Sequence, residues 1–287
     1  MTLIEAGRCH RVALAVDNVS QVEGWLRRVL GAGSLGIDRR ASRDDAGAAR
    51  INSEMDDLAG ADSQILRLGG YPIILFSGGA VGGPVAAHLT RFGPSVHSLA
   101  WEVDDLWATQ NLLVRRGIGL GAINVPGRHF FMHPRDTRGV LMEWTDGNFG
   151  ENERRPDEGG GVVDIDSIAW VSAAVTDAEE TAAFLGDLCG ASPIGGNEQG
   201  PSDREVTIDV VIGDLTLRLV TPRSTASPYA DVLAAGPRLC ALALKVGDLD
   251  KSMASLEEAG APVVRREGNL AATDPAATFG IPIEWTA

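Results

Sequence analysis

The chain has 287 residues, of which 44% are hydrophobic and 22% are charged, and its net charge is −14 at pH 7. This composition is typical of about two folded domains and excludes a chain that is disordered throughout. The negative charge repels a phosphate backbone, so the sequence predicts no nucleic-acid partner. No apolar run approaches the roughly 18 residues of a membrane span, and the first residues do not resemble a secretory signal. We therefore expect no membrane partner and a cytoplasmic location.

The first half of the chain predicts a strand, a helix and a hairpin, and then a second set of the same kind. An apolar strand over residues 11–16 precedes a helical pattern that ends at Gly31, and a hairpin turning at Gly69 follows. The cycle restarts with a strand from His97 and a helix. It closes with a hairpin over residues 128–144.

The second half repeats this order after a polar, glycine-rich stretch at about residues 146–163. The two halves end alike, with GVLMEWT at 139–145 and GIPIEWT at 280–286. Within the first half, HRVALAVDNV from His10 and HSLAWEVDDL from His97 both place an aspartate seven residues after the histidine. Repetition at this level predicts four copies of one βαβββ unit.

Four such units in two pairs resemble the vicinal oxygen chelate superfamily, which includes glyoxalase I, methylmalonyl-CoA epimerase, extradiol dioxygenases and bleomycin-resistance proteins. The resemblance covers nearly the whole chain and implies an α+β fold, with the units paired into two eight-stranded, partly open barrels. It implies a metal-binding glyoxalase-like domain at 1–148, a linker at 149–162 and a degenerate domain without a metal site at 163–287.

All five histidines lie in the first half, which holds 15 basic and 16 acidic residues, whereas the second half holds 10 basic and 23 acidic residues. Imidazole chemistry is therefore expected in the first half, which also has room for a small anionic substrate. The three cysteines are widely separated and form no CxxC pair, so we expect reduced, packed thiols.

The resemblance places the metal ligands of the family at His10, His97 and Glu143. Two imidazoles and one carboxylate leave coordination positions open for water and a bidentate oxygen substrate. The expected cofactor is one divalent ion, which is Fe, Mn, Co, Ni or Zn. In the second half, Ala169 and Cys240 stand at the histidine positions, and only the equivalent carboxylate remains. That half is then left to close over the site, to support it or to form a homodimer.

The closing hairpin, FMHPRDTRGVLMEW, is similar to the corresponding segment of methylmalonyl-CoA epimerases. It favours an epimerase, isomerase or lyase in which the metal stabilises an enolate during proton transfer. Glu54 is the candidate base, and Glu143 would serve only if it left the metal. Arg128 and Phe130 are the candidate substrate-binding residues, because alternation puts them on one presumed inward face with Met132.

Two other functions stay open. A fourth family ligand would fall at about Ile73, which is apolar, so a strict glyoxalase I coordination sphere is not predicted. An Fe(II) ring-cleaving dioxygenase fits the chain length, and a metal-free protein that binds a drug or metabolite fits the fold. The remaining histidines and three tryptophans are assigned to structure: His129 should miss the metal, His133 lies at a turn, His88 lies on a surface connection, and Trp25, Trp107 and Trp170 pack in the core.

Overall fold

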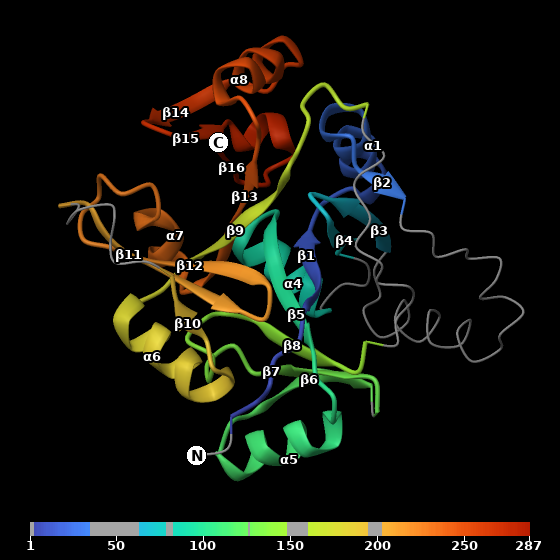
Figure 1. Ribbon diagram of the computed structural model, residues 1–287, viewed down its shortest axis with the longest axis vertical. Coiled ribbons are helices and arrows are strands. Elements are labelled where there is room, and N and C mark those ends of the chain that lie inside the picture. The colour runs from blue at the N-terminus through green and yellow to red at the C-terminus, as the bar shows by residue number, and fades with distance from the viewer. Residues whose placement is uncertain (1–2, 35–62, 79–82, 126, 148–159, 195–202) are drawn as a thin grey trace, which may run out of the picture. The chain divides into compact units, whose positions relative to one another are not determined.

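The computed structural model describes residues 3–34, 63–78, 83–125, 127–147, 160–194 and 203–287 (Figure 1). Helices and strands in these ranges alternate as four βαβββ units, as the repeat predicts. No helix in the described ranges is long and apolar enough to cross a membrane.

The first half of the chain contains two of these units, with one additional helix, α4, between them. The bounds of the first unit are β1 (Cys9–Ala15), α1 (Val19–Leu30), β2 (Gly33–Ser34), β3 (Ser63–Leu68) and β4 (Tyr71–Phe76). Those of α4 and the second unit are α4 (Pro84–Phe92), β5 (Ser95–Glu102), α5 (Leu106–Arg115), β6 (Leu120–Val125), β7 (His129–Met132) and β8 (Met142–Thr145).

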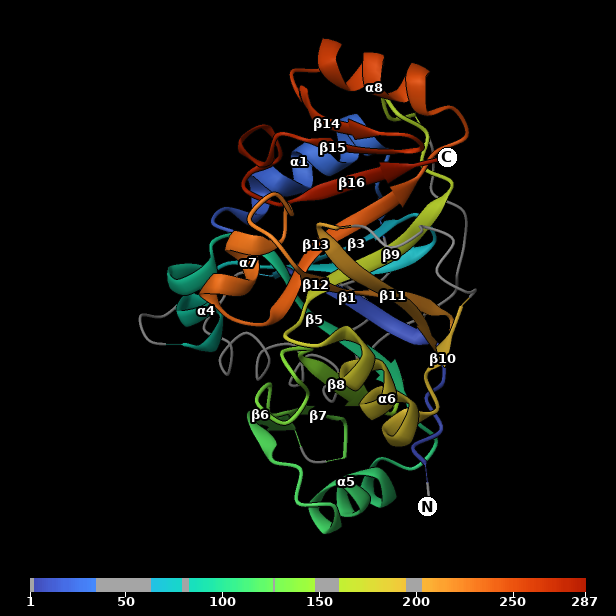
Figure 2. The ribbon, with the colours of Figure 1, turned by 90° about the vertical axis from the view of Figure 1, so that its left-hand side faces the viewer.

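The second half repeats this arrangement, again with a short helix, α7, between its units. Figure 2 shows the last three strands side by side, with helix α8 beside β14. The third unit has β9 (Ser167–Ala174), α6 (Ala178–Cys189), β10 (Ser192–Pro193), β11 (Glu205–Ile212) and β12 (Leu215–Pro222). After α7 (Ala230–Ala235), the fourth has β13 (Arg238–Lys245), α8 (Leu249–Glu258), β14 (Val263–Glu267), β15 (Leu270–Thr273) and β16 (Ile283–Thr286).

Each half forms one eight-stranded sheet. The strand order is β2-β3-β4-β1-β5-β8-β7-β6 in the first half and β10-β11-β12-β9-β13-β16-β15-β14 in the second. Both orders have two end strands, so neither sheet closes completely. Parallel pairs such as β1 with β4 stand beside antiparallel hairpins. The expected α+β class with two partly open, eight-stranded sheets is confirmed.

The repeated aspartates of the sequence mark the starts of the unit helices. In each unit a side chain just before the helix accepts a hydrogen bond from a backbone N–H three residues later, which satisfies one of the amides at the helix end. Asp17 and Asp104 themselves stand one residue before the cap. The capping residues are Asn18, Asp105, Asp177 and Asp248.

Tryptophan side chains fill part of the core. Trp101 and Trp144 lie opposite each other on β5 and β8, and both are fully buried. Trp25 is also buried, as predicted. The prediction for Trp107 is wrong, because its side chain is 57% exposed. Helix α5 buries Leu106, Thr109 and Leu113, and Trp107 lies outside that stripe.

The packing divides the chain into two compact units that do not follow the two halves. The first compact unit combines residues 1–10, 98–148 and 170–242, and the second combines residues 11–97, 149–169 and 243–287. Each compact unit therefore draws on both halves of the sequence.

The segment before β1 packs on the second half within the first compact unit. The backbone N–H of Ile4 donates to the carbonyl of Leu188 at the end of α6 (3.0 Å). At the turn between β11 and β12, the Asp214 carboxylate accepts from the backbone N–H of Cys9 (2.7 Å). The Cα of Gly213 faces the carbonyl of Gly7 so closely that a side chain would not fit. The first residues of the chain are thus part of the packing of the second half.

The segment before β9 makes the reciprocal contacts within the second compact unit. The backbone N–H of Val163 donates to the carbonyl of Val29 at the end of α1 (2.9 Å). The turn at Gly69 between β3 and β4 lies against the backbone of Ser167 and Ile168. Each half therefore receives the lead-in segment of the other.

Candidate functional site

Glu143, on β8, is a carboxylate almost completely excluded from water, with 1% of its surface exposed. The sheet register puts Ala100 of β5 on one side of it and Phe131 of β7 on the other. Residues that are directly opposite share a face of the sheet, so His129 and Phe131 lie on the face of Glu143. The Nδ1 atom of His129 is 2.8 Å from Oε1 of Glu143, and both side chains are buried.

This register corrects the predicted face of the closing hairpin. Phe130 lies opposite Trp144 and is 2% exposed, so it does not share the face of Glu143. His129, which was expected to miss the site, is the histidine beside the carboxylate. Alternation fixes which residues share a face, but the register set by the turn decides which of the two faces carries Glu143.

Arg128 lies just before β7, at the rim of the hairpin. Its side chain is 36% exposed, and Nη1 is 3.8 Å from the carboxylate of Asp146. The carbonyl of Arg128 accepts from the hydroxyl of Thr145, which fixes the backbone there. A guanidinium in this position is accessible to a substrate anion. The nearby carboxylate of Asp146 already balances part of its positive charge.

The two predicted histidine ligands belong to different compact units. His10, at the start of β1, is 4% exposed and belongs to the first compact unit, like Glu143. His97, on β5, is half-buried and belongs to the second. There its ring lies 5.0 Å from that of His88, measured between centroids. His88, expected on a surface connection, is half-buried, and its Nε2 lies 2.9 Å from Oγ of Ser95.

Among the described residues, no three His, Cys, Asp or Glu side chains gather closely enough to hold a metal ion. The predicted triad takes groups from both compact units and stays a prediction. The chemistry of the donors fits a divalent transition metal, because such ions bind imidazole nitrogen and carboxylate oxygen. A buried carboxylate such as Glu143 also needs a cation or hydrogen-bond donors to compensate for its lost hydration. Glu54, the candidate base, lies outside the described residues.

The register also locates the fourth ligand position of the family. Ala100 stands three residues after His97 and lies opposite Glu143. Ala13 stands three residues after His10 and lies opposite Ile74. The equivalent of Glu143 in the first unit is therefore Ile74, one residue beyond the predicted position. It is also apolar and offers no metal ligand.

Among the comparisons with known proteins, the match to a family model falls in the second half of the chain. Residues 171–279 match the family described as the Glyoxalase/Bleomycin resistance protein/Dioxygenase superfamily. These residues, 109 of the 287 in the chain, are therefore similar to that superfamily. The match lies in the half that has no histidine, and the first half repeats the same units.

Two solved structures share the fold of this chain along almost its whole length. A mutant of 4-hydroxymandelate synthase from Streptomyces coelicolor is 18% identical with a TM-score of 0.64, over 98% of this chain and 92% of that one. A fusion of a xylose isomerase-like TIM barrel with 4-hydroxyphenylpyruvate dioxygenase is 16% identical with a TM-score of 0.59, over 99% of this chain. The chain spans 49% of that fusion protein.

A third structure, methylmalonyl-CoA epimerase from Mycobacterium tuberculosis, is 22% identical over 42% of this chain and 87% of that one, with a TM-score of 0.36. No curated protein matches the sequence well enough to count as a relative.

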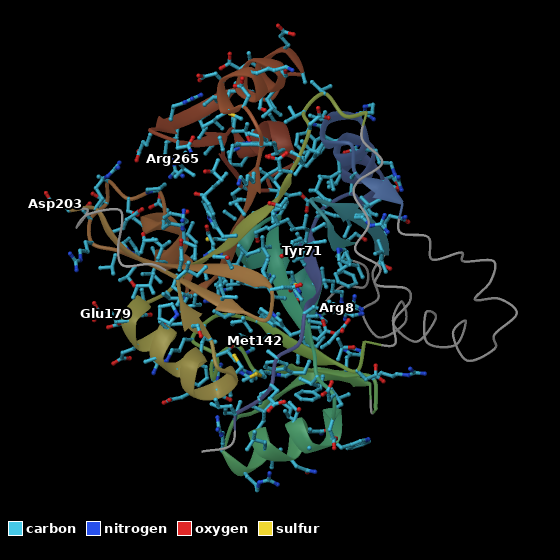
Figure 3. The ribbon with its side chains drawn as sticks, viewed as in Figure 1. Arg8, Tyr71, Met142, Glu179, Asp203 and Arg265 are labelled. Atoms are coloured by element: carbon cyan, nitrogen blue, oxygen red, sulfur yellow. The ribbon has the colours of Figure 1, made fainter. Side chains whose placement is uncertain are left out.

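In the second half of the chain, two arginines pair with carboxylates of Asp209 and Glu284. Glu284, the equivalent of Glu143, is 5% exposed in its side chain and lies 2.8 Å from Nη2 of Arg265 (labelled in Figure 3). Arg218 of β12 lies opposite Ser172 of β9, so it has the position in the third unit that Ile74 has in the first. Its guanidinium donates two hydrogen bonds to Asp209 and lies 3.5 Å from the ring centre of Trp170. An internal guanidinium therefore balances the carboxylate in this half.

Removing the guanidinium beside Glu284 is expected to destabilise the protein. In Arg265→Met the buried carboxylate loses its cation, which we expect to lower the free energy of unfolding by about 3 kcal/mol. The double variant Arg265→Met/Glu284→Gln should recover most of this loss, because no charge is then buried without a partner. Urea unfolding of both variants measures the difference. A single variant as stable as the wild type would contradict this account of the pair.

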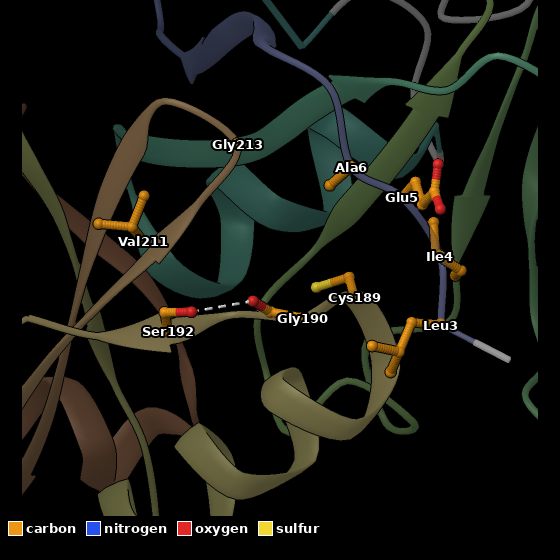
Figure 4. A pocket seen from close by; sticks show the side chains of 9 residues that line it. All are labelled: Leu3, Ile4, Glu5, Ala6, Cys189, Gly190, Ser192, Val211 and Gly213. Carbon is orange, nitrogen blue, oxygen red and sulfur yellow. Dashed lines mark hydrogen bonds between the residues drawn. The ribbon is translucent and has the colours of Figure 1, made fainter. Parts of the chain in front are cut away.

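A pocket of about 630 Å³ lies within the first compact unit, between the segment before β1 and the end of α6 (Figure 4). Leu3, Ile4, Glu5 and Cys189 are among the residues that line it. Burial raises the pKa of the Cys189 thiol from its usual 9 to about 12, and a backbone hydrogen bond to Ala191 offsets this in part. The thiol also donates to the carbonyl of Leu185 (3.3 Å). Cys189 is therefore a packed, protonated thiol.

Cys189 should react slowly with iodoacetamide in the folded protein at pH 8, because only the thiolate is nucleophilic and burial disfavours it. In urea it should react at the rate of an ordinary cysteine. The unfolded state releases this proton above about pH 9, so the stability that the thiol contributes is present below that pH and falls as the pH rises toward 12. Peptide mass spectrometry measures labelling at this residue. Labelling at the same rate in both states would contradict the assignment.

Proposed function

We propose that the protein is an enzyme that binds one divalent metal ion in its first half through His10, His97 and Glu143. The observation that carries the proposal is the burial of the Glu143 carboxylate in the same compact unit as the buried His10. In the second half the equivalent carboxylate, Glu284, pairs with Arg265. A divalent metal ion binds imidazole nitrogen and carboxylate oxygen together, which is the donor set that we propose here.

The reaction that we propose is proton transfer on a small carboxylate or acyl substrate, of the epimerase, isomerase or lyase type. The ion, when bound, would stabilise negative charge on a carbonyl oxygen of the substrate. The protein residues would then position the substrate and move the proton. Arg128, exposed at the rim, would bind a substrate carboxylate through its planar guanidinium. Glu54 would act as the general base that removes the proton.

A second candidate function is that of an Fe(II) extradiol-type dioxygenase that cleaves an aromatic ring. It is supported by the names of the two solved structures that align along the whole chain, a 4-hydroxymandelate synthase and a 4-hydroxyphenylpyruvate dioxygenase fusion. Their identity to this chain is under 20%, so they support a fold that accommodates such a reaction.

Isotope and oxygen measurements on the metal-loaded protein separate these reactions. Proton transfer predicts that a substrate from a panel of 2-oxo acids and acyl thioesters exchanges a C–H proton for deuterium in D₂O, without oxygen uptake. Loss of exchange in Glu54→Gln would identify the base. Oxygen uptake with a phenolic or catecholic substrate under Fe(II) loading would instead support the dioxygenase. A protein that binds such compounds with neither reaction, and without metal, would be a binding protein.

A further inference from the structure

We propose that the exposed face of helix α5 is a homodimer interface, where it packs antiparallel against the same helix of a second copy of this chain. The face carries Trp107 and Val114, which are 57% and 58% exposed. They stand seven residues apart, about two helical turns, so both project from the same side of the helix. The core is contacted by another side of α5, through Leu106, Thr109 and Leu113. An apolar stripe on this helix is therefore left open to solvent.

The repeat shows that the fold does not require an apolar side chain at the position of Trp107. Every unit helix follows a capping residue, and Trp107 is the second residue after the cap of α5. The second residues after the other three caps are exposed and polar or charged: Ser20 in α1, Glu179 in α6 and Asp250 in α8. Tryptophan is among the residues that contribute most to the stability of protein–protein interfaces. The exposed tryptophan is thus a feature of α5 that its packing in the core does not explain.

Charges at the two ends of α5 complement each other in an antiparallel pair of identical helices. Asp104 stands one residue before the cap, and Arg115 lies in the last turn, and both are exposed. The pair of charges and the pair of apolar residues are both centred on residues 109–111. A two-fold axis at this point would bring Trp107 onto Val114 of the second copy. The same axis would bring Asp104 near Arg115 of the second copy, and each contact would occur twice.

The position and size of this face determine how strong the dimer should be. Helix α5 belongs to residues 1–150, whose 15 basic and 16 acidic residues contribute only −1 to the net charge of −14, so repulsion between the copies is smallest in this half. The helix has ten residues and is therefore about 15 Å long. A contact of this length falls at the low end of interface sizes, where complexes are weak or transient. We expect a dissociation constant in the micromolar range.

Sedimentation velocity of the full chain, from micromolar to millimolar concentration, tests the proposal. The wild type should shift from the mass of one chain to the mass of two. Trp107→Asp copies the charge that α8 has at this position, and an acidic residue suits the first turn of a helix. It should weaken the dimer by about 100-fold or more, because the tryptophan enters the interface twice. Ser20→Asp is the matched control on α1 and should dimerise as the wild type does.

Charge exchange tests the antiparallel arrangement separately. Arg115→Asp alone would put two carboxylates side by side and should weaken the dimer several-fold, whereas the double variant Asp104→Arg/Arg115→Asp should restore it. Thermal unfolding of each variant reports whether it folds. Wild-type protein that keeps the mass of one chain at millimolar concentration would overturn the proposal, and so would a dimer that Trp107→Asp leaves unchanged. If the single and double charge variants dimerise equally, the antiparallel pairing is wrong.

Discussion

Replacing Glu143 by glutamine is expected to lower divalent-metal affinity by roughly 100-fold or more, since loss of even a ligand's partner costs about 10–100-fold. The substitution keeps the size of the side chain and removes the negative charge. It therefore separates metal binding from packing at a position that is 1% exposed. Titration with Mn(II) and Co(II) measures the affinity, and thermal unfolding of the metal-free protein reports any change in folding.

The chain offers a matched control in Glu284→Gln. Glu284 occupies the same position in the repeat, on β16, and is 4% exposed. Because Arg265 already balances it and its half has no histidine, this variant should bind metal as the wild type does. Equal loss of affinity in both variants, or no loss in either, would contradict the assignment of Glu143 as a ligand.

Replacing Gly213 by alanine should cost more stability than the same change at any ordinary turn. Gly213 has φ of +60°, and an added Cβ would clash with the carbonyl oxygen of Gly7. A left-handed alanine alone costs about 1–2 kcal/mol. The clash must also displace the segment before β1, which would disturb the hydrogen bond from Cys9 to Asp214.

Gly268→Ala is the control for the backbone contribution. Gly268 lies in the hairpin turn between β14 and β15 with φ of +56°, and nothing lies within 4 Å of its added Cβ. We expect Gly268→Ala to lose about 1 kcal/mol and Gly213→Ala to lose at least about twice as much. Hydrogen exchange should also increase at residues 4–9 only in the Gly213 variant. Equal losses in urea unfolding, with unchanged exchange, would show that the lead-in segment does not pack on this turn.

Local patterns were sufficient to predict the architecture. The helix-ending glycines Gly31 and Gly190 both adopt the left-handed conformation, with φ of 67° and 69°. The GVLMEWT and GIPIEWT segments both contain a closing strand, β8 and β16. Each of these signals depends on neighbouring residues in the chain, so the sequence carries it directly.

Features that depend on distant contacts were not predictable. The face of Glu143 on the closing hairpin depends on register, and a shift of one residue exchanges His129 for Phe130. The packing of His88 against His97 depends on how α4 lies against the start of β5. The reciprocal lead-in segments join residues more than 130 positions apart, such as Ile4 with Leu188 and Val29 with Val163. No periodicity in a single segment reports such contacts.

The two halves illustrate how one fold carries different chemistry. The family match lies in residues 171–279, where Arg218 pairs with Asp209, and Arg265 of this range pairs with Glu284 just beyond it. The first half keeps the same strand positions and has histidines there. Sequence-family similarity and the proposed metal ligands thus fall in different halves, as expected when a site is added to a fold shared by both.

The most direct test of the account is a crystal structure of the full chain soaked with Co(II), with diffraction data collected at the cobalt absorption edge. We predict one anomalous peak per chain in the first half, about 2.0–2.2 Å from nitrogen atoms of His10 and His97 and an oxygen of Glu143. A peak bound by other residues, or no peak in a crystal that contains the metal at saturating concentration, would contradict the account.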